Sequence, residues 1–163
     1  MTVSLRPFRI DELDLLAELY GRSAVFVGEP PDRERLRLRI ARSGRLVEGR
    51  LDFAVDADGR LAGDVGARRP KEGLPPGVFE LGIELFEEFR GRGYGTAALE
   101  QLNERLFREH CAERVQASTA VWNAAMRRVL EKLGFVEEGV MRAYMPRPDG
   151  GRDDYVLYGC RRR

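Results

Sequence analysis

Apolar side chains alternate with polar ones in several short stretches of the chain and recur every three or four positions in others. Alternation is typical of strands with one buried face, and the longer spacing is typical of helices that pack on one side. The alternating stretches predict strands at 3–8, 51–55, 61–67, 78–86, 115–121, 135–141 and 155–158. The helical spacing predicts helices that begin near Asp11, Pro30, Ala97 and Asn123.

The first two predicted helices follow directly on the N-terminal strand. Asp11 is expected to cap the first, whose apolar positions are Leu13, Leu15, Leu16 and Leu19. The second is highly charged, and its expected buried positions are Leu36, Ile40 and, as a further candidate, Leu38. Gly44 is expected to end it. The loop 21–31 between the two helices is a candidate border for a substrate site.

The two later helices carry clearer end signals. The third is expected to end at His110 and to bury Ala98, Leu99, Leu102, Leu106 and Phe107. Asn123 is expected to cap the fourth, which should end at Gly134 and whose apolar side holds Met126, Val129, Leu130 and Leu133.

Two clusters of turn residues, 56–59 and 146–151, each separate a pair of predicted strands. Such clusters favour hairpins, whose strands are antiparallel. Hairpins mixed with helices predict an α+β fold with a mixed, mostly antiparallel central sheet flanked by helices. No repeat or linker interrupts the pattern, so the whole chain, 1–163, is expected to form one domain.

Charge is dense but balanced, with 28 Lys and Arg against 27 Asp and Glu and a formal net charge of +1. No general attraction to nucleic acid follows from this balance. The arginine-rich helix at 33–42 is a local exception, but Asp32 and Glu34 dilute its charge and it has no aromatic residue for base stacking. Nucleic-acid binding is therefore poorly supported.

The chain also lacks the signals of membrane insertion or export. No stretch approaches the roughly 20 consecutive apolar residues of a membrane span, and residues 1–9 lack the apolar centre of a signal peptide. Cys111 and Cys160 lie far apart without a Cys-x-x-Cys spacing, so neither a disulfide framework nor a metal site is indicated. We expect a cytoplasmic protein that uses no metal and has no membrane partner.

Residues 90–95 read Arg-Gly-Arg-Gly-Tyr-Gly, between an apolar run and a predicted helix. Glycines let backbone amides converge on an anion, and the following helix adds its free N-terminal amides. A Walker loop is excluded because no lysine follows the glycines, and the spacing of Gly91, Gly93 and Gly95 does not fit a Rossmann fingerprint. We name residues 90–96 the cradle and expect it to bind a pyrophosphate.

The spacing Arg90-x-x-Gly93-x-Gly95 resembles the acyl-coenzyme A loop of the GNAT superfamily of N-acyltransferases. Other segments extend the resemblance toward its ribosomal-protein N-terminal acetyltransferase branch: Glu80, Leu81, Gly82 and Ile83 before the loop, then Asn123, the run 130–135, Glu138, Gly139, Arg142, Asp153, Asp154, Tyr155 and Tyr158. The resemblance implies the GNAT fold, with a sheet splayed at the acyl-coenzyme A loop.

The same resemblance implies which residues hold the acetyl-coenzyme A (acetyl-CoA). The pyrophosphate is expected on the amides of Gly91, Arg92, Gly93, Tyr94, Gly95 and Thr96. Arg90 and Arg92 supply complementary charge, the backbone around Leu85 is expected to pair with the pantetheine, and Asn123 to contact it.

Acyl transfer to an amine needs a group that removes a proton from the amine, which is mostly protonated at neutral pH. Glu80 matches the position of an acidic residue in the resembled branch, and Glu84, on the same face of the strand, is the second choice. Either carboxylate fits a solvated or ion-paired strand residue as well.

A proton donor for the departing thiolate is harder to assign. Family members often carry a serine where this chain has Met126, which cannot donate a proton. Tyr144 and Tyr94 are the remaining candidates by chemistry, although a thiolate leaves without a dedicated acid. His110 and Cys111 are adjacent on a helix and point apart, so a thiol dyad is disfavoured. Asp153 and Asp154 are expected to contact a turn or a basic residue.

These observations lead to an acetyl-CoA-dependent N-acetyltransferase that acts on a primary amine by direct attack in a ternary complex. A protein N-terminus and a small-molecule amine fit the resemblance equally well as acceptors, and a homodimer is left open. A coenzyme A-binding sensor or regulatory module without catalysis is the alternative, because Met126 replaces a hydroxyl.

Overall fold

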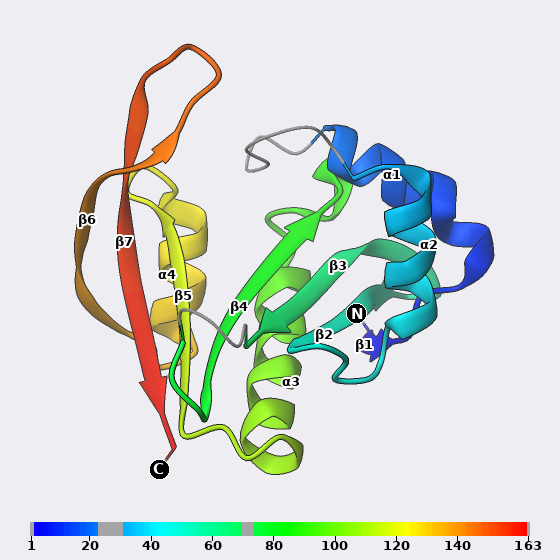
Figure 1. Ribbon diagram of the computed structural model, residues 1–163, viewed down its shortest axis with the longest axis horizontal. Helices are drawn as coiled ribbons and strands as arrows, with labels where there is room; N and C mark the ends of the chain where they lie inside the picture. The colour runs from blue at the N-terminus through cyan, green and yellow to red at the C-terminus, as the bar shows by residue number, and fades with distance from the viewer. Residues whose placement is uncertain (1, 23–30, 70–73, 163) are drawn as a thin grey trace.

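One mixed β-sheet organises the computed structural model, which describes residues 2–22, 31–69 and 74–162. Its seven strands lie in the order β1-β2-β3-β4-β5-β7-β6 within these ranges (Figure 1). The strands are β1 (Val3–Arg6), β2 (Arg50–Ala57), β3 (Arg60–Arg68), β4 (Val78–Leu85), β5 (Arg114–Ala120), β6 (Val136–Pro146) and β7 (Arg152–Arg161). Every neighbouring pair is antiparallel except β4 and β5, which are parallel. The predicted mixed, mostly antiparallel sheet is confirmed.

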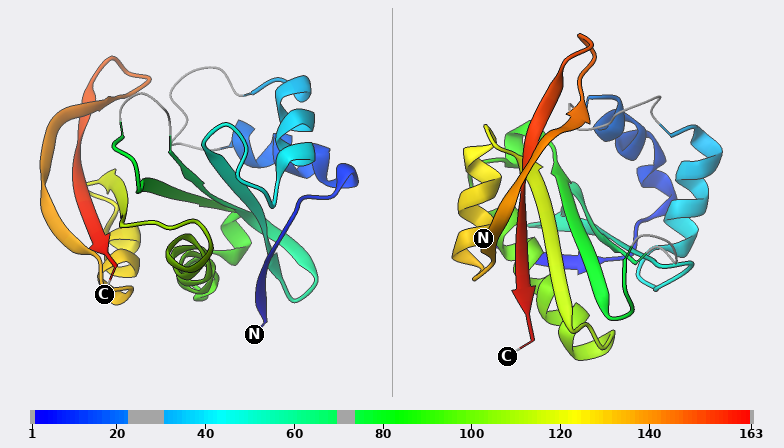
Figure 2. Two further views of the ribbon diagram at one scale, coloured as in Figure 1. Left: turned by 60° about the horizontal axis from the view of Figure 1, so that its bottom comes forward. Right: turned by 60° about the vertical axis from the view of Figure 1, so that its left-hand side comes forward.

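Two pairs of helices cover opposite faces of the sheet (Figure 2). The helices are α1 (Leu13–Gly21), α2 (Arg33–Arg42), α3 (Tyr94–Glu109) and α4 (Ala124–Lys132). α1 and α2 lie on one face, and α3 and α4 on the other. Within the described part of the chain, no helix is long and apolar enough to cross a membrane.

The two faces are held by separate apolar clusters. Leu99, Leu102 and Leu106 of α3, with Leu130 of α4, are completely buried against strand residues such as Val65. On the other face, α1 and α2 pack together through a second, smaller cluster that contains Phe8, Leu13, Leu16, Leu19, Tyr20, Leu36, Ile40, Ala54 and Leu61. The predicted buried positions of α3 and α4 are confirmed, with Phe107, Met126, Val129 and Leu133 partly buried against the larger cluster.

The predicted start of the first helix is wrong. Asp11 lies inside a short 3₁₀ turn, η1 (Ile10–Glu12), and Glu12 occupies the N-terminal cap position of α1 without a side-chain capping bond. The prediction that Leu38 is buried is also wrong, because its side chain is 50% exposed. Only Leu36 and Ile40 of α2 are buried, because the face of the helix that contacts α1 and the sheet is narrow.

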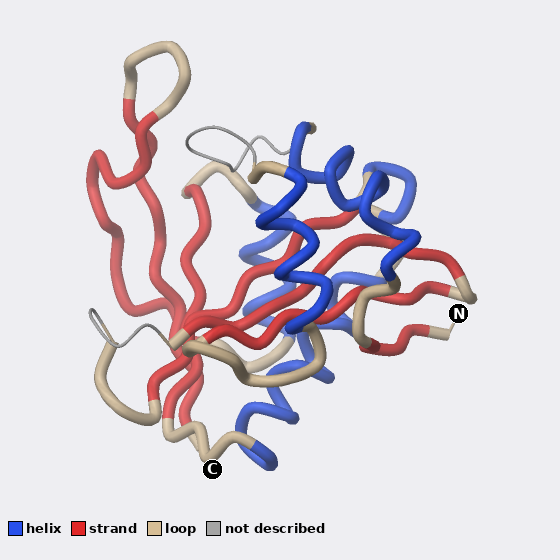
Figure 3. Tube along the Cα trace, turned by 45° about the vertical axis from the view of Figure 1, so that its right-hand side comes forward, coloured by secondary structure: helices blue, strands red, loops and turns tan. Residues whose placement is uncertain are grey.

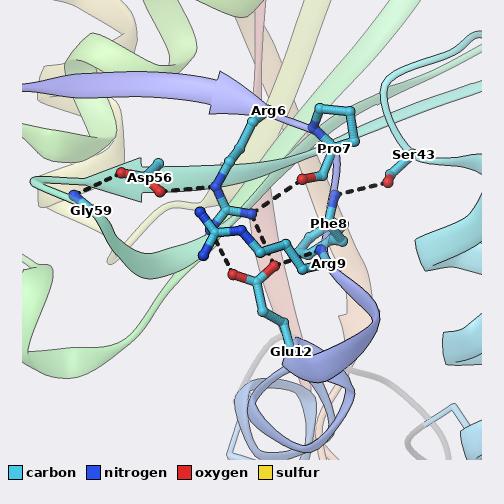
Figure 4. Close-up of polar contacts among 8 residues, drawn as sticks. All are labelled: Arg6, Pro7, Phe8, Arg9, Glu12, Ser43, Asp56 and Gly59. Atoms are coloured by element: carbon cyan, nitrogen blue, oxygen red, sulfur yellow. Dashed lines mark hydrogen bonds and ion pairs between the residues drawn. The ribbon is translucent and has the colours of Figure 1, made fainter.

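An ion-pair network explains why the chain turns at η1 (Figure 4). Arg6 donates from Nε to Asp56 of β2 at 2.8 Å and from Nη2 to Glu12 at 2.5 Å. Glu12 also accepts from the Arg9 backbone amide at 2.8 Å. Burial of Glu12 works against its ionisation, but these bonds outweigh that effect and hold its pKa below the ordinary value. The network ties the N-terminal strand and the first turn to the sheet.

The second helix begins at Arg33, three residues after the predicted start at Pro30. Asp32 caps α2 by accepting a hydrogen bond from the Arg35 amide at 2.8 Å. The helix ends at Arg42, and Gly44 follows with φ +78°, as predicted for a helix stop. Most of the predicted loop 21–31 lies outside the described residues.

The C-terminal hairpin is longer than its sequence pattern predicts. β6 and β7 extend past the predicted ranges, and their connecting turn projects beyond the rest of the sheet (Figure 3). β6 is an edge strand with almost every residue exposed, and its pairing with β7 is irregular after Glu137 and again after Met141. An exposed, irregular strand shows no clean alternation, so its full length was not visible in the sequence.

Candidate active site

β4 and β5 pair over three positions and then separate. Their register runs from Val78 opposite Arg114 to Glu80 opposite Gln116, although both strands continue further. Figure 1 shows the two strands diverging from this point. Because none of the described strands fills the gap, the polar groups of both strand edges remain open to a ligand lying between them. The splay that the resemblance implied is therefore present.

The cradle lies at the wide end of this gap. α3 begins at Tyr94, and its cap residue Gly93 has the left-handed φ of +86° that glycine adopts without strain. Gly91 also has a positive φ, +71°. No side chain caps α3, and its first turn carries no acidic residue. The first amides of the helix thus face outward with the positive end of the helix dipole, as an anion site requires.

Gly95 brings the start of α3 close to β4. A side chain there would begin 3.4 Å from Leu85 Cδ1 and 3.8 Å from Ile83 Cδ1. Leu85, the last residue of β4, therefore packs directly under the cradle. Sequence analysis predicted that the Leu85 backbone and the cradle serve one ligand, and the structure brings them together.

The two cradle arginines differ in their surroundings. Arg90 donates from Nε to the Leu85 carbonyl at 2.9 Å and from Nη2 to Glu84 at 2.7 Å. Arg92 is exposed at the tip of the loop, beside Gly91 and Gly93. Arg90 thus braces the end of β4, while Arg92 presents its charge to solvent at the mouth of the cradle.

Asn123 caps α4 as predicted. Its Oδ1 accepts a hydrogen bond from the Met126 amide at 3.2 Å, and its Nδ2 donates to Thr119 Oγ1 at 3.1 Å. Thr119 belongs to β5, so the cap also ties α4 to the strand that borders the gap. Met126 is half-buried against the main apolar cluster, which fits the packing role that its chemistry predicts.

A cavity of about 430 Å³ opens on the face of the sheet that α1 and α2 cover. Its floor comes from β2, β3, β4 and β5, and its walls from the helices and the C-terminal hairpin. The lining residues are Tyr20, Arg39, Arg50, Asp52, Asp64, Gly66, Ala67, Arg68, Glu80, Leu81, Gly82, Ile83, Glu84, Ser118, Tyr144, Met145 and Tyr155. Residues of β4 and β5 that border the gap are among them, so the cavity and the gap adjoin.

Both predicted catalytic carboxylates line this cavity. Glu80 sits where β4 and β5 part, ion-paired with Arg68 at 2.9 Å and within 3.4 Å of Ser118 Oγ. Glu84 lies toward the cradle and pairs with Arg90 at 2.7 Å. Their side chains are only 17% and 16% exposed. Glu80 is thus placed at the vertex of the gap, and Glu84 nearer its open end.

The two tyrosines proposed as proton donors lie in different places. Tyr144 lines the cavity from the hairpin, with its ring 5.6 Å from that of Tyr155. Tyr94 instead donates its hydroxyl hydrogen bond to Asp58, in the β2–β3 turn, at 3.2 Å. Its ring also makes an edge contact with Phe89 at 5.7 Å. Of the two, the structure brings Tyr144 to the cavity.

The aspartates near the C-terminus make local structural contacts. Asp153 accepts a hydrogen bond from Trp122 Nε1 at 3.1 Å and lies 3.5 Å from Arg147. Asp154 accepts from the Ala143 amide at 2.7 Å. Ala143 has a positive φ of 47°, so this bond supports the irregular turn of β6. The expected contacts with a turn and a basic residue are both observed.

A buried polar cluster at the inner end of the cavity was missed in the sequence. Arg39 Nη2 bridges Asp64 at 2.5 Å and Asp52 at 2.9 Å, and the Tyr20 hydroxyl donates to Asp64 at 2.8 Å. Burial, reinforced by the nearby Asp52 charge, outweighs Arg39 and raises the pKa of Asp64 to about 6. The signal that went unused is a charged residue inside the apolar strand 61–67.

Comparison with known proteins identifies this arrangement. Residues 2–136 match the model of the acetyltransferase (GNAT) domain. The chain belongs to the GNAT acetyltransferase family. The matched range includes the gap, the cradle and α4, and it ends at the first residue of β6.

Individual relatives agree with this family assignment. A stretch of 86 residues is 37% identical to Bacillus subtilis YdaF, whose name proposes a ribosomal N-acetyltransferase; it covers 52% of this chain and 45% of YdaF. A solved structure from T. thermophilus, described as a candidate acetyltransferase, is 30% identical, with a TM-score of 0.73 over 99% of this chain and 86% of that one.

A third similarity concerns the fold. Mycobacterium smegmatis RimJ, solved in complex with CoA-disulfide, has a TM-score of 0.79 at 21% identity, over 98% of this chain and 81% of RimJ. The family and fold class that the sequence predicted are thereby confirmed.

Proposed function

We propose that this GNAT protein transfers an acetyl group from acetyl-CoA to a primary amine by direct attack in a ternary complex. The gap between β4 and β5 is the observation that carries the proposal. It connects an anion-binding cradle at one end with Glu80 and a polar cavity at the other. A long donor with a pyrophosphate in its middle and a thioester at its tip fits such a site.

The donor is proposed to bind along the gap. The amides from Gly91 to Thr96 hold its pyrophosphate, with Arg92 as the exposed cation of the loop. The pantetheine runs between the Leu85 backbone and Asn123. The CoA-disulfide bound in the solved structure of RimJ supports this donor class.

The acceptor amine is proposed to enter through the cavity. Glu80, directly or through water, takes a proton from the ammonium group, and the free amine forms a bond to the thioester carbon. Collapse of the tetrahedral intermediate breaks the carbon–sulfur bond, the nitrogen loses its second proton to water to give the amide, and the thiolate takes a proton from Tyr144 or from solvent. Glu84 is the alternative base, although its pairing with Arg90 directs it toward the cradle.

The test is release of coenzyme A thiol with a panel of amines. The panel contains peptides that represent protein N-termini, ribosomal proteins included because of the name of YdaF, and small amines of increasing size. Turnover of at least one amine supports the enzyme. Tight acetyl-CoA binding without turnover of any amine would contradict it and support the alternative, a coenzyme A sensor, which Met126 at the usual hydroxyl position favours.

Replacement of Glu80 tests the proposed base. We expect Glu80→Gln to lower kcat by about 10²-fold to 10⁴-fold, because the isosteric amide cannot accept the proton. The dissociation constant of acetyl-CoA, measured by calorimetry, should not change. Glu84→Gln is the matched comparison on the same strand face. A larger loss of kcat in Glu84→Gln than in Glu80→Gln would identify Glu84 as the base instead of Glu80.

A further inference from the structure

The two oxygens of the Glu80 carboxylate have different partners. Arg68 donates to Oε2 alone, from Nη2 at 2.9 Å and from Nε at 3.3 Å. Oε1 receives one long hydrogen bond, from Ser118 Oγ at 3.4 Å. Ser118 lies on β5, across the point where the strands separate. The carboxylate is thus held by one oxygen, while the other faces the gap.

This arrangement follows from the register of three strands. Arg68 of β3 lies directly opposite Glu80 of β4, and Gln116 of β5 lies opposite Glu80 on the other side. A guanidinium presents several donors in a rigid plane, so two of them reach one oxygen and restrict the rotation of the carboxylate. A lysine at the same position would supply a positive charge but no planar pair of donors to fix the orientation of the carboxylate.

The charged groups near Glu80 on β5 and on β4 itself are paired with other residues. On β5, Arg114 donates from Nη1 to Glu138 at 2.8 Å and from Nε to Gln116 at 3.3 Å. On its own strand, Glu84 is paired with Arg90. Ser118, from β5, is uncharged. Among the described residues, Arg68 is therefore the cation that is hydrogen-bonded to Glu80 at the vertex of the gap.

We propose that Arg68 is a positioning residue, which holds Glu80 Oε2 so that Oε1 faces the gap and takes the proton of the acceptor amine. This inference rests on the proposed function. Arg68 is 56% exposed, and an ion pair with one exposed partner contributes little to stability. The effect of the pair on the orientation of the Glu80 carboxylate is larger, because proton transfer requires the accepting oxygen to lie within hydrogen-bond reach of the amine.

Three variants test the inference with the best amine of the panel. We expect Arg68→Gln to lower kcat by about 10-fold to 100-fold, with little change in the KM for acetyl-CoA. Arg68→Lys should restore only part of kcat, because an ammonium group supplies charge but no planar pair of donors. Arg42→Gln is the control, since Arg42 forms a comparable exposed pair with Glu48, at 2.7 Å, away from the cavity.

A crystal structure of the Arg68→Gln variant supplies a readout that needs no acceptor. We expect the Glu80 carboxylate to rotate, so that Oε1 no longer faces Ser118. An unmoved carboxylate, or a kcat equal to that of Arg42→Gln, would overturn the proposal. If Glu80→Gln lowers kcat and Arg68→Gln does not, this inference alone fails. If Glu80→Gln leaves kcat unchanged, the proposed base itself is wrong.

Discussion

Asp64 is almost completely buried, and its surroundings compensate its charge only in part. It is 5% exposed, and its Oδ2 accepts from both Tyr20 and Arg39, while Oδ1 is buried without a hydrogen-bond partner among the described residues. Arg39 divides its charge between Asp64 and Asp52. Burial disfavours the ionised form of this carboxylate. The cluster therefore links α1 and α2 to the sheet at some cost in stability.

The pH dependence of unfolding tests this view of Asp64. The folded pKa, about 6, lies above the ordinary value of 3.8, so the folded state binds the proton more tightly than the unfolded state. The contribution of Asp64 to the free energy of unfolding is complete below pH 4 and decreases as the pH rises through 6. The decrease should reach at most about 3 kcal/mol.

Urea unfolding between pH 4 and 7 measures this contribution. The difference in the free energy of unfolding between the wild type and Asp64→Asn should fall with rising pH across this interval. Asp14→Asn, at an aspartate whose side chain is 80% exposed, controls for the same change of side chain. Equal pH dependence in the two variants would contradict the assignment.

At the scale of elements, predictions succeeded where the signal was local. The helical spacing of α3 and α4, the Asn123 cap and the glycine conformations of the cradle all depend on residues close in sequence, and the structure confirms them. Asp11 failed as a cap because Arg6 and Arg9 bind Glu12 instead. The length of β6 was missed because an exposed edge strand has no buried face to impose alternation.

The cradle gives a prediction at this scale. Gly93→Val places a β-branched residue at φ +86°, next to the first free amides of α3, and should weaken acetyl-CoA binding by at least about 100-fold. Gly150→Val is a matched control, because Gly150 has φ +84° in the distant β6–β7 turn. Both variants should lose about 1–2 kcal/mol of stability. Calorimetry that finds unchanged affinity for Gly93→Val would reject the cradle as the donor site.

At the scale of the molecule, the gap divides the sheet into two parts. β1 to β4 carry α1 and α2, while β5 carries α4 and pairs with the projecting hairpin of β7 and β6 (Figures 1 and 2). Direct pairing between the parts consists of three positions of β4 and β5. A donor in the gap would contact Leu85 on one side and Asn123 on the other. Binding should therefore stabilise the whole sheet.

Unfolding in the presence of acetyl-CoA measures this stabilisation. At a free concentration 100 times its dissociation constant, acetyl-CoA should raise the free energy of unfolding by about 2.7 kcal/mol, because it binds the folded state. An acceptor amine alone lacks the pyrophosphate and should produce a smaller shift. No shift with acetyl-CoA at saturating concentration would contradict the donor site.

The sequence by itself determined the order of strands and helices along the chain, the glycine-rich loop of the cradle and the Asn123 cap, because each depends on backbone preferences and spacing within a few residues. It also placed Glu80 before the cradle through resemblance. Only the tertiary structure decided which partners these residues meet. The pairing of Arg68 with Glu80 and the cluster at Asp64 join residues 12 and 25 or more positions apart. Strand register and helix packing bring such residues together, and no local pattern encodes the contact.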